Sequence, residues 1–430
     1  MLDVYVSKQL VGVLDQPEPY TFVFNYLPDA PSVLPVSLLM PKRTASWVSK
    51  ELHPVFQTSL PEGSLRELIV RNFSKRFKRF GDLELLAVIG ENMIGRIQVT
   101  PHGQALSGLT AYESLSSLIK EDTTKLVKHY LGTRLHESGV SGGFMKFLAK
   151  SPVSHQDGRP TLALDDWIIK LNDEDHPQIV LVEYFGMMAA RAAGLTVPEV
   201  HLSEDRKHLL VKRFDLTADS KRLGFEDMCA LLGLPARDKF TGSVERVIKT
   251  IGTYCQGSHV KQSYDHFFGQ YLLASSIRNG DAHLKNFGLI YDEIKDAALA
   301  PTYDMLSMSV YAPQLSNSND ADDGLALNFE GSKRWLTQKT ITTLANKCLV
   351  STKRRNEWET QIAVALIETA KKVVEFVNTY PQDHFAKMAQ RMLELWSIGL
   401  KAFDLEAAKQ IRDHVALVPA PKCPLRQADK

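Results

Sequence analysis

The sequence predicts an α+β protein of two lobes, with a small α+β unit at its N-terminus. Three observations support this fold class. The first part of the chain contains short runs in which apolar and polar side chains alternate, as in antiparallel strands. Strand and helix patterns then mix up to about residue 215, and the remainder is mainly helical in its periodicity. A length of 430 residues is sufficient for two or three domains with substantial cores.

The first predicted domain covers residues 1–103. Residues 65–80 have a helical pattern and are unusually basic. Such a run is usually a solvated face, although it can also meet an acidic partner or a DNA backbone. Alternating runs predict an antiparallel meander and a closing strand, at residues 2–6, 10–14, 20–26 and 94–99.

The second predicted domain covers residues 104–215 and resembles the N-terminal, nucleotide-binding lobe of a kinase. It opens with a helical stretch at 112–130. A later helix begins near Gln178 and ends at Gly194, because glycine readily adopts the left-handed conformation that follows a helix. The predicted strands of this domain are residues 144–148, 166–171, 197–202 and 209–214.

The third predicted domain covers residues 216–430 and is mostly helical. Residues 312–324 are polar and rich in turn formers, which suits an activation or substrate loop, with a plain surface loop as the simpler alternative. The predicted helices cover residues 226–232, 243–255, a stretch beginning at 264, 337–348, 351–378, 384–400 and 405–416.

Composition excludes several classes of protein. Hydrophobic residues at 44% and charged residues at 23% are typical of a globular chain, and a net charge of +1 gives no footprint for nucleic acid. The cysteines are scattered without C-x-x-C spacing, which argues against zinc and disulfide frameworks and for a reducing compartment. There is no run of 18 apolar residues, so we expect a cytoplasmic protein without a membrane span.

The segment 263–304 contains the most informative pattern. A helix with one aromatic face ends at Asn279-Gly280, and Asp281 and Asn286 follow with D-x-x-x-x-N spacing. A short strand, a turn and a second strand then lead to Tyr303-Asp304. Helix, polar loop, hairpin and aspartate is the order in which a protein kinase presents its base, its metal-binding Asn and its metal-binding Asp.

Phosphoryl transfer explains why these residue types occur together. It needs a carboxylate near the acceptor hydroxyl, for which Asp281 is placed, and oxygen ligands for magnesium, for which Asn286 and Asp304 are placed. A D-x-x-x-x-N spacing alone arises easily by chance, so the flanking helix and hairpin carry the argument. His283 can brace the loop or touch a phosphate, and bracing is the commoner role of a loop histidine.

Further residues are candidates for nucleotide binding. The glycine-rich segment 138–143 would let backbone N–H groups approach phosphates, although a tight structural turn explains it equally well. Lys170, on a strand followed by a helix with Glu183, matches the lysine and glutamate that clamp phosphates in kinases; its alternative is a solubilising edge lysine. Residues 211–215 would cross between the lobes, where Phe214 packs against adenine or belongs to the core.

In combination, these residues resemble one family, the HipA-type toxin kinases of bacterial toxin–antitoxin systems. The likeness covers most of the chain, and no single motif in it is specific. The matching motifs are Pro35-Val36-Ser37-Leu38, Leu60-Pro61-Glu62-Gly63, Val182-Glu183-Tyr184, Gly194-Leu195-Thr196-Val197-Pro198, Val211 to Asp215, Gly280 to Phe287 and Tyr303-Asp304.

The resemblance implies a serine/threonine kinase that depends on ATP and Mg²⁺, with Asp281 as base and Asn286 and Asp304 as magnesium ligands. Known members phosphorylate a translation component, such as an aminoacyl-tRNA synthetase, and so arrest growth. A helix-turn-helix antitoxin usually neutralises the toxin and tethers it to operator DNA. The residues that the resemblance places at ATP are Lys170, Val140, Ser141, Gly142, Gly143, Lys146, Lys212, Phe214, His283 and Tyr303.

The glycine-rich loop departs from the family pattern. Many members carry an autophosphorylated serine where this chain has Gly139. Ser141 fits a second serine found in some members, and Ser138 is adjacent, so these two are the candidate phosphosites. The usual Gln-Glu before the loop lysine is replaced by Phe144-Met145.

Three functions are therefore considered, in this order. The first is an active protein kinase of the toxin type. The second is a non-catalytic scaffold that binds ATP or an antitoxin and serves repression, which the altered loop favours. The third is a small-molecule or lipid kinase, because G-D-x-H-x-x-N also resembles the loop of phosphoinositide kinases.

Overall fold

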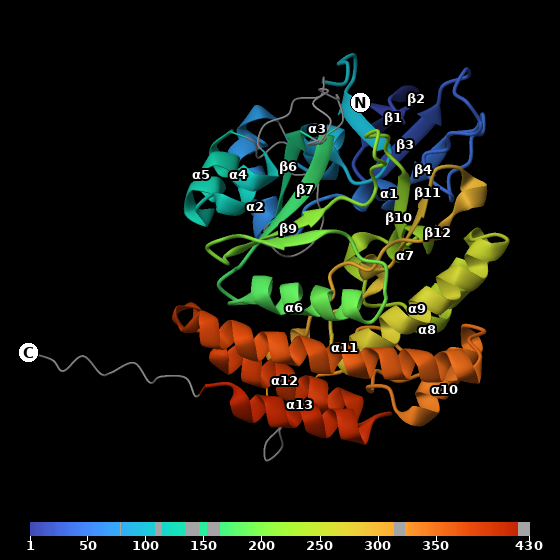
Figure 1. Cartoon of the computed structure of the whole chain (residues 1–430). Helices are drawn as coiled ribbons and strands as arrows, with labels where there is room; N and C mark the ends of the chain where they lie inside the picture. Colours follow the sequence, from blue (N-terminus) through green and yellow to red (C-terminus); the bar gives the residue numbers. More distant parts are fainter. Residues whose placement is uncertain (78, 108–113, 134–145, 153–163, 314–322, 420–430) are drawn as a thin grey trace, which may run out of the picture.

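In the residues that it describes, the computed structural model contains three antiparallel sheets above a layer of long helices (Figure 1). It describes residues 1–430 except 78, 108–113, 134–145, 153–163, 314–322 and 420–430. The α+β class and the division into strand-rich and helical parts are confirmed. Among the described residues, none of the helices combines the length and apolar character needed to cross a membrane.

The N-terminal unit is a five-stranded sheet with three helices. Its strand order is β4-β3-β2-β1-β5, so the last strand closes beside the first, with Leu2 opposite both Leu14 and Pro101. The strands are β1 (Leu2–Val6), β2 (Gln9–Glu18), β3 (Thr21–Tyr26), β4 (Trp47–Ser49) and β5 (Ile97–Pro101). The helices are α1 (Pro54–Gln57), α2 (Gly63–Phe73) and α3 (Asp82–Ile89).

The basic helix expected at 65–80 is shorter than predicted. Helix α2 ends at Phe73, residues Ser74–Arg76 form a 3₁₀ turn, and Phe77 is extended. The rings of Phe77 and Phe80 then pack edge to face, 5.4 Å between centroids.

The second region forms a four-stranded sheet of order β6-β7-β9-β8. Its strands are β6 (Lys146–Pro152), β7 (Leu164–Leu171), β8 (Val200–Leu202) and β9 (His208–Lys212). Helix α6 (Ile179–Ala192) follows β7. The helix expected at 112–130 is divided into α4 (Leu115–Lys120) and α5 (Thr123–Thr133), because Glu121 is extended at the end of α4.

The helical lobe begins with a small sheet of order β10-β11-β12. Its strands are β10 (Gly224–Asp227), β11 (Gly288–Tyr291) and β12 (Ala298–Leu299). The expected helix at 226–232 is wrong at its start, because Glu226 and Asp227 pair with β11. Only α7 (Met228–Leu231) is helical, and the Asp227 side chain caps it by accepting from the N–H of Ala230 at 2.8 Å.

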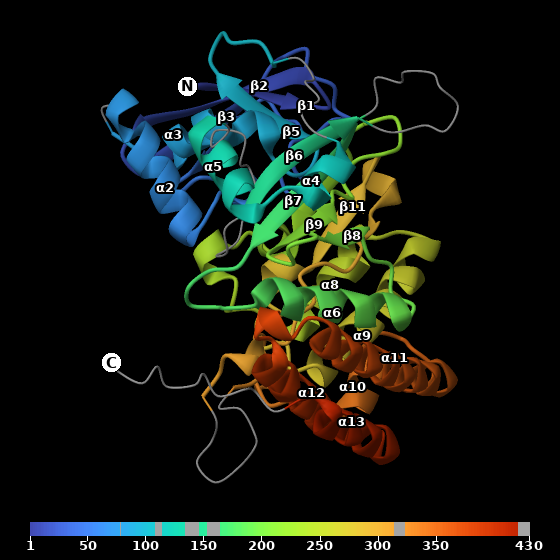
Figure 2. The ribbon, with the colours of Figure 1, turned by 60° about the vertical axis from the view of Figure 1, so that its left-hand side comes forward.

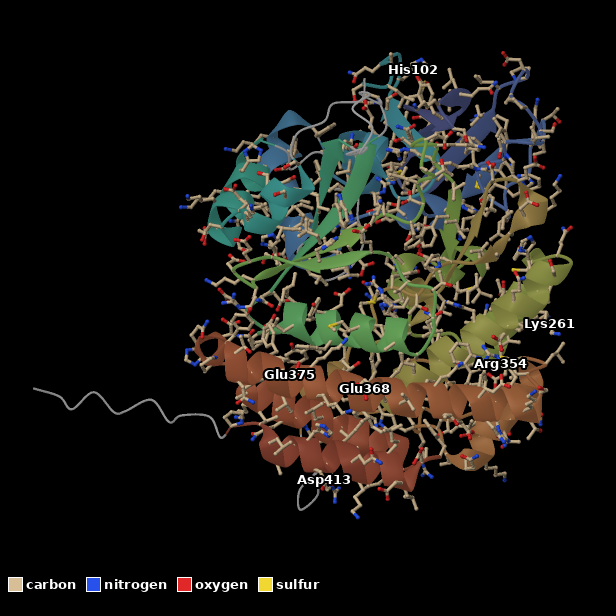
Figure 3. All side chains as sticks on the ribbon, viewed as in Figure 1. His102, Lys261, Arg354, Glu368, Glu375 and Asp413 are labelled. Carbon is tan, nitrogen blue, oxygen red and sulfur yellow. The ribbon has the colours of Figure 1, made fainter. Side chains whose placement is uncertain are left out.

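Six further helices complete this lobe within the described part of the chain. They are α8 (Val244–Tyr254), α9 (Ser258–Ser276), α10 (Gln338–Lys347), α11 (Thr352–Thr379), α12 (Ala386–Leu400) and α13 (Leu405–Leu417). In Figures 1 and 2, α6 runs between the second sheet and α11. Figure 3 shows Glu368 and Glu375 on the solvent side of α11, whose other face buries Trp358 and Leu366.

Two large hydrophobic cores and one small cluster, counted among the described residues, hold these parts together. The core of the N-terminal sheet continues into the second sheet, through Phe147, Trp167 and Ile169. Helix α6 belongs mainly to the core of the helical lobe, through Leu181 and Phe185, and its Val180 packs against Leu209 and Val211 of β9. Helix α6 is therefore packed against both the helical lobe and the second sheet.

Candidate active site

A pocket opens where the N-terminal unit, the second sheet and the helical lobe meet. It contains about 1060 Å³ of empty space, counting solvent at its mouth. Its wall includes Lys146, Lys170, Glu183, Lys212, Phe214, Asp281, His283, Asn286, Tyr303 and Asp304. The predicted site residues that the structure describes therefore line one cavity.

The loop with Asp281 is shaped by the end of α9. That helix buries Phe267 and Tyr271, and its cap residue Ile277 is followed by Arg278 in the left-handed region, φ 59°. The Asn279 side chain then accepts from the N–H of Asp281 at 3.2 Å and donates to the carbonyl of Asp304 at 3.4 Å. One asparagine therefore joins the start of the loop to the segment that carries Asp304.

Asp281 has the properties of a base that works near neutral pH. Burial raises the pKa of this carboxyl to about 6, with Lys239 acting in the opposite direction and Asp304 reinforcing the rise. His283 Nε2 lies 3.9 Å from Asp281 Oδ1. Burial lowers the pKa of His283 to about 3, so the imidazole is neutral near pH 7 and places no positive charge beside Asp281.

Asn286 and Asp304 present oxygen atoms to the pocket. Asn286 Oδ1 is buried and has no hydrogen-bond partner among the residues that the structure describes. Asp304 adopts φ 51°, a strained conformation of a kind that clusters at functional sites. Burial alone would raise the pKa of Asp304, but the ammonium groups of Lys146 and Lys170 outweigh it and hold that pKa below its usual range.

This pair of oxygen ligands fits magnesium. Mg²⁺ usually takes one or two protein carboxylates and completes its shell with phosphates and water. A free amide oxygen and an ionised carboxylate in the wall of one pocket meet that requirement. Within the described ranges, no group of three or more His, Cys, Asp or Glu residues is arranged to hold a metal without such help.

Lys170 and Glu183 form a buried ion pair between β7 and α6. The Lys170 ammonium donates to the carboxylates of both Glu183 and Asp304. Burial would lower the pKa of Lys170, but these two carboxylates raise it above its usual value, so the lysine is charged. Lys146 lies on the neighbouring strand, with its Nζ 3.7 Å from Asp304 Oδ2.

Aromatic rings form another wall of the pocket. Phe214 stacks on Tyr303 with 5.4 Å between ring centroids and 27° between planes, and Phe225 lies edge-on to it at 5.5 Å. The Tyr303 hydroxyl donates to the carbonyl of Lys285 at 2.8 Å. Phe214 is therefore part of an aromatic cluster and also lines the cavity. Lys212 Nζ is turned towards Glu199, 3.8 Å away.

The comparisons with known proteins agree over both halves of the chain. The family model of the HipA-like C-terminal domain matches residues 138–392, and that of the HipA N-terminal domain matches residues 2–100. The chain belongs to the HipA family. Two relatives from Sinorhizobium fredii (strain NBRC 101917 / NGR234) bear the names "Putative kinase Y4dM" and "Putative kinase Y4mE".

These HipA-family relatives are distant. Y4dM is 26% identical over 340 residues, which cover 75% of this chain and 74% of Y4dM. Y4mE is 27% identical over 335 residues, which cover 74% of this chain and 79% of Y4mE. HipA of Shewanella oneidensis, solved with HipB and operator DNA, has a TM-score of 0.59 at 15% identity, covering 97% of this chain and 96% of its own. This last likeness shows the shared fold.

Not every predicted site residue of this HipA-family chain can be placed. Val140, Ser141, Gly142 and Gly143, with the candidate phosphosites Ser141 and Ser138, lie outside the described residues. Other pocket residues were missed by the motif analysis, above all Glu62, Asp227 and Lys239. Glu62 belongs to the Leu60-Pro61-Glu62-Gly63 motif, but its partner Lys285 is 223 positions away, and no local pattern joins the two.

Proposed function

We propose that this HipA-family chain is a serine/threonine protein kinase that uses ATP and Mg²⁺ and acts as the toxin of a toxin–antitoxin system. The observation that supports this most is that Asp281, Asn286, Asp304 and Lys170 line one pocket. These are the residue types that a phosphoryl-transfer site requires, in the order along the chain in which kinases carry them.

The residues have separable tasks in this proposal. Asp281 accepts the proton of the acceptor hydroxyl while that oxygen attacks the γ-phosphorus, and ADP leaves with the electron pair of the broken P–O bond. Lys170, held charged by Glu183, orients the phosphates, and Phe214 packs against adenine. A bound Mg²⁺, held by Asn286 and Asp304, would neutralise the charge on the phosphate oxygens.

The substrate and the partner belong to the same proposal. A translation component such as an aminoacyl-tRNA synthetase is the proposed acceptor, because growth arrest by a kinase requires an essential target. A helix-turn-helix antitoxin is the proposed partner, with DNA contacted only through it. Support for the partner is the shared fold with the HipA chain of Shewanella oneidensis, which was solved with HipB and operator DNA.

A labelling experiment tests the proposal. Lysate is incubated with ATP labelled at the γ-phosphate and with wild type, Asp281→Asn or Asp296→Asn, the last an exposed carboxylate beyond β11. The expected result is a labelled protein band with wild type and Asp296→Asn, and a loss of about 10²–10⁴-fold with Asp281→Asn, as for removal of a general base. The band is identified by mass spectrometry.

Two other results would replace this proposal. ATP binding without turnover by the wild type would identify a scaffold that serves repression. Label on a metabolite or an inositol lipid, with protein unlabelled, would identify a small-molecule or lipid kinase.

A further inference from the structure

Glu62, from the N-terminal unit, lies in the wall of the pocket between two lysines of the helical lobe. Its Oε1 is 2.7 Å from Lys285 Nζ, and its Oε2 is 2.9 Å from Lys239 Nζ. The Lys285 side chain is 5% exposed and that of Glu62 26%, so the first contact is largely shielded from water. Each carboxylate oxygen thus faces one ammonium group.

Both lysines are tied to the Asp281 loop. Lys285 directly precedes Asn286, and the carbonyl of Lys285 accepts from the Tyr303 hydroxyl at 2.8 Å. The carbonyl of Lys239 accepts from the N–H of Leu284 at 3.1 Å. A displacement of either lysine would therefore be transmitted to the backbone between Asp281 and Asn286.

The N-terminal unit also makes polar contacts with residues 236–239 of the helical lobe at two further positions. The Arg237 guanidinium contacts both carboxylate oxygens of Glu51, at 2.7 and 2.6 Å. The N–H of Ala236 donates to Gln57 Oε1 at 2.9 Å. Of the three N-terminal residues that make these contacts, Glu51, Gln57 and Glu62, it is Glu62 that lines the pocket.

Charge balance shows what the carboxylate does. Burial would raise the pKa of Glu62, but Lys285 and Lys239 lower it to about 2, so the group is ionised at neutral pH. The same lysines also act to lower the pKa of other acidic groups, Lys285 that of Asp227 and Lys239 that of Asp281. Without Glu62, the buried ammonium of Lys285 would turn to another carboxylate of the pocket.

We propose that Glu62 is a positioning residue for phosphoryl transfer, which acts through Lys285 and Lys239 to hold the Asp281–Asn286 loop in its working arrangement. This inference rests on the proposed kinase function and makes the N-terminal unit part of the catalytic unit. Glu62 touches lysines and no reacting atom, so its effect should appear in kcat. The ATP contacts of Lys170 and Phe214 lie on other elements and stay in place.

The test compares Glu62→Gln with Glu67→Gln, an exposed glutamate of helix α2, which begins directly after Glu62. Glu62→Gln is expected to lower kcat at least about tenfold and to change KM for ATP less than about threefold, whereas Glu67→Gln leaves both unchanged. In a Lys239→Met/Lys285→Met background, Glu62→Gln should lower kcat by less than about threefold more, because both of its partners are gone. Two outcomes would overturn the proposal. One is a loss of kcat on Glu62→Gln that is equally large in both backgrounds, and the other is a wild-type kcat for a folded Glu62→Gln.

If Glu62→Gln does not fold, Glu62→Asp replaces it, since one methylene fewer keeps the charge but lengthens both contacts. Glu62→Asp is expected to lower kcat in the wild-type background and to have no further effect in the Lys239→Met/Lys285→Met background. An equal loss, or none, in both backgrounds would overturn the proposal. A wild-type protein without phosphoryl transfer would instead refute the kinase function, so the two failures are distinguishable.

Discussion

At Asp281, burial raises the pKa of the carboxyl and the nearby ammonium groups of Lys239 and Lys146 lower it. Its pKa of about 6 means that the base is protonated as the pH falls through that value, so activity is lost on the acid side. We expect kcat/KM to fall by about tenfold for each pH unit below this point. Because Lys239 lowers the pKa of Asp281, Lys239→Met should move the acid limb to higher pH.

The pH–rate profile of wild type and Lys239→Met checks this expectation. Lys249→Met, an exposed lysine of α8, is the control and should leave the profile in place. A wild-type profile that stays flat well below pH 6 would show that another group, or none, is the base.

Lys170 forms a buried ion pair whose loss should lower the unfolding free energy measurably. Its replacement by Met leaves the carboxylates of Glu183 and Asp304 without their shared ammonium. Breaking a buried pair in this way costs about 3–5 kcal/mol of unfolding free energy. Removing the charge of Glu183 as well, in Lys170→Met/Glu183→Gln, should recover part of that loss.

Denaturant unfolding of these variants measures the effect. Lys212→Met is the matched control, because its side chain is 36% exposed and its ion pair with Glu199 is worth less than about 1 kcal/mol. Equal losses for Lys170→Met and Lys212→Met would contradict the buried-pair interpretation.

At the scale of elements, local sequence predicted much of the site and missed its exact limits. The aromatic face of α9, the turn at Asn279 and the strand β11 follow from periodicity and turn chemistry. The start of α7 was missed because Glu226 has high helix propensity, whereas pairing with β11 and bonds to Ser37 and Tyr291 hold it in a strand. Tertiary contacts decided that element.

Helix α6 supports the cleft through a close approach that only glycine permits. A Cβ on Gly186 would lie 2.0 Å from the carbonyl oxygen of Met305, next to Asp304. Gly186→Ala should therefore push α6 away from that segment, destabilise the fold by about 1–3 kcal/mol and weaken the Lys170–Asp304 contact. Thermal melting and KM for ATP check this, with the exposed Ala192→Ser of the same helix as control. An unchanged melting temperature and KM would show that α6 does not set the cleft.

At the scale of the whole molecule, the site joins residues that are far apart in the chain. The sequence motifs named Asp281, Asn286 and Asp304, which lie within one stretch of helix, loop and hairpin. Glu62 and the second contact of Asp304, with Lys146, depend on how three sheets meet, and no periodicity or spacing reports that arrangement. Local chemistry is therefore predictable here, whereas contacts between distant parts of the chain, such as those of Glu62, are not.

Because the pocket joins all three parts, a ligand bound there should stabilise the whole molecule by mass action. At a concentration a hundredfold above Kd, ATP with Mg²⁺ should add about 2.7 kcal/mol to the unfolding free energy. In thermal melting, ATP with Mg²⁺ should raise the melting temperature, and EDTA should remove that rise. Asp304→Asn should lose the Mg²⁺-dependent part of the rise in melting temperature, because asparagine keeps the shape of the aspartate side chain but not its charge. The exposed Asp296→Asn is the control and should respond as wild type does. A rise that is the same with EDTA, or the same in Asp304→Asn, would mean that nucleotide binds without the metal pair assigned to Asn286 and Asp304.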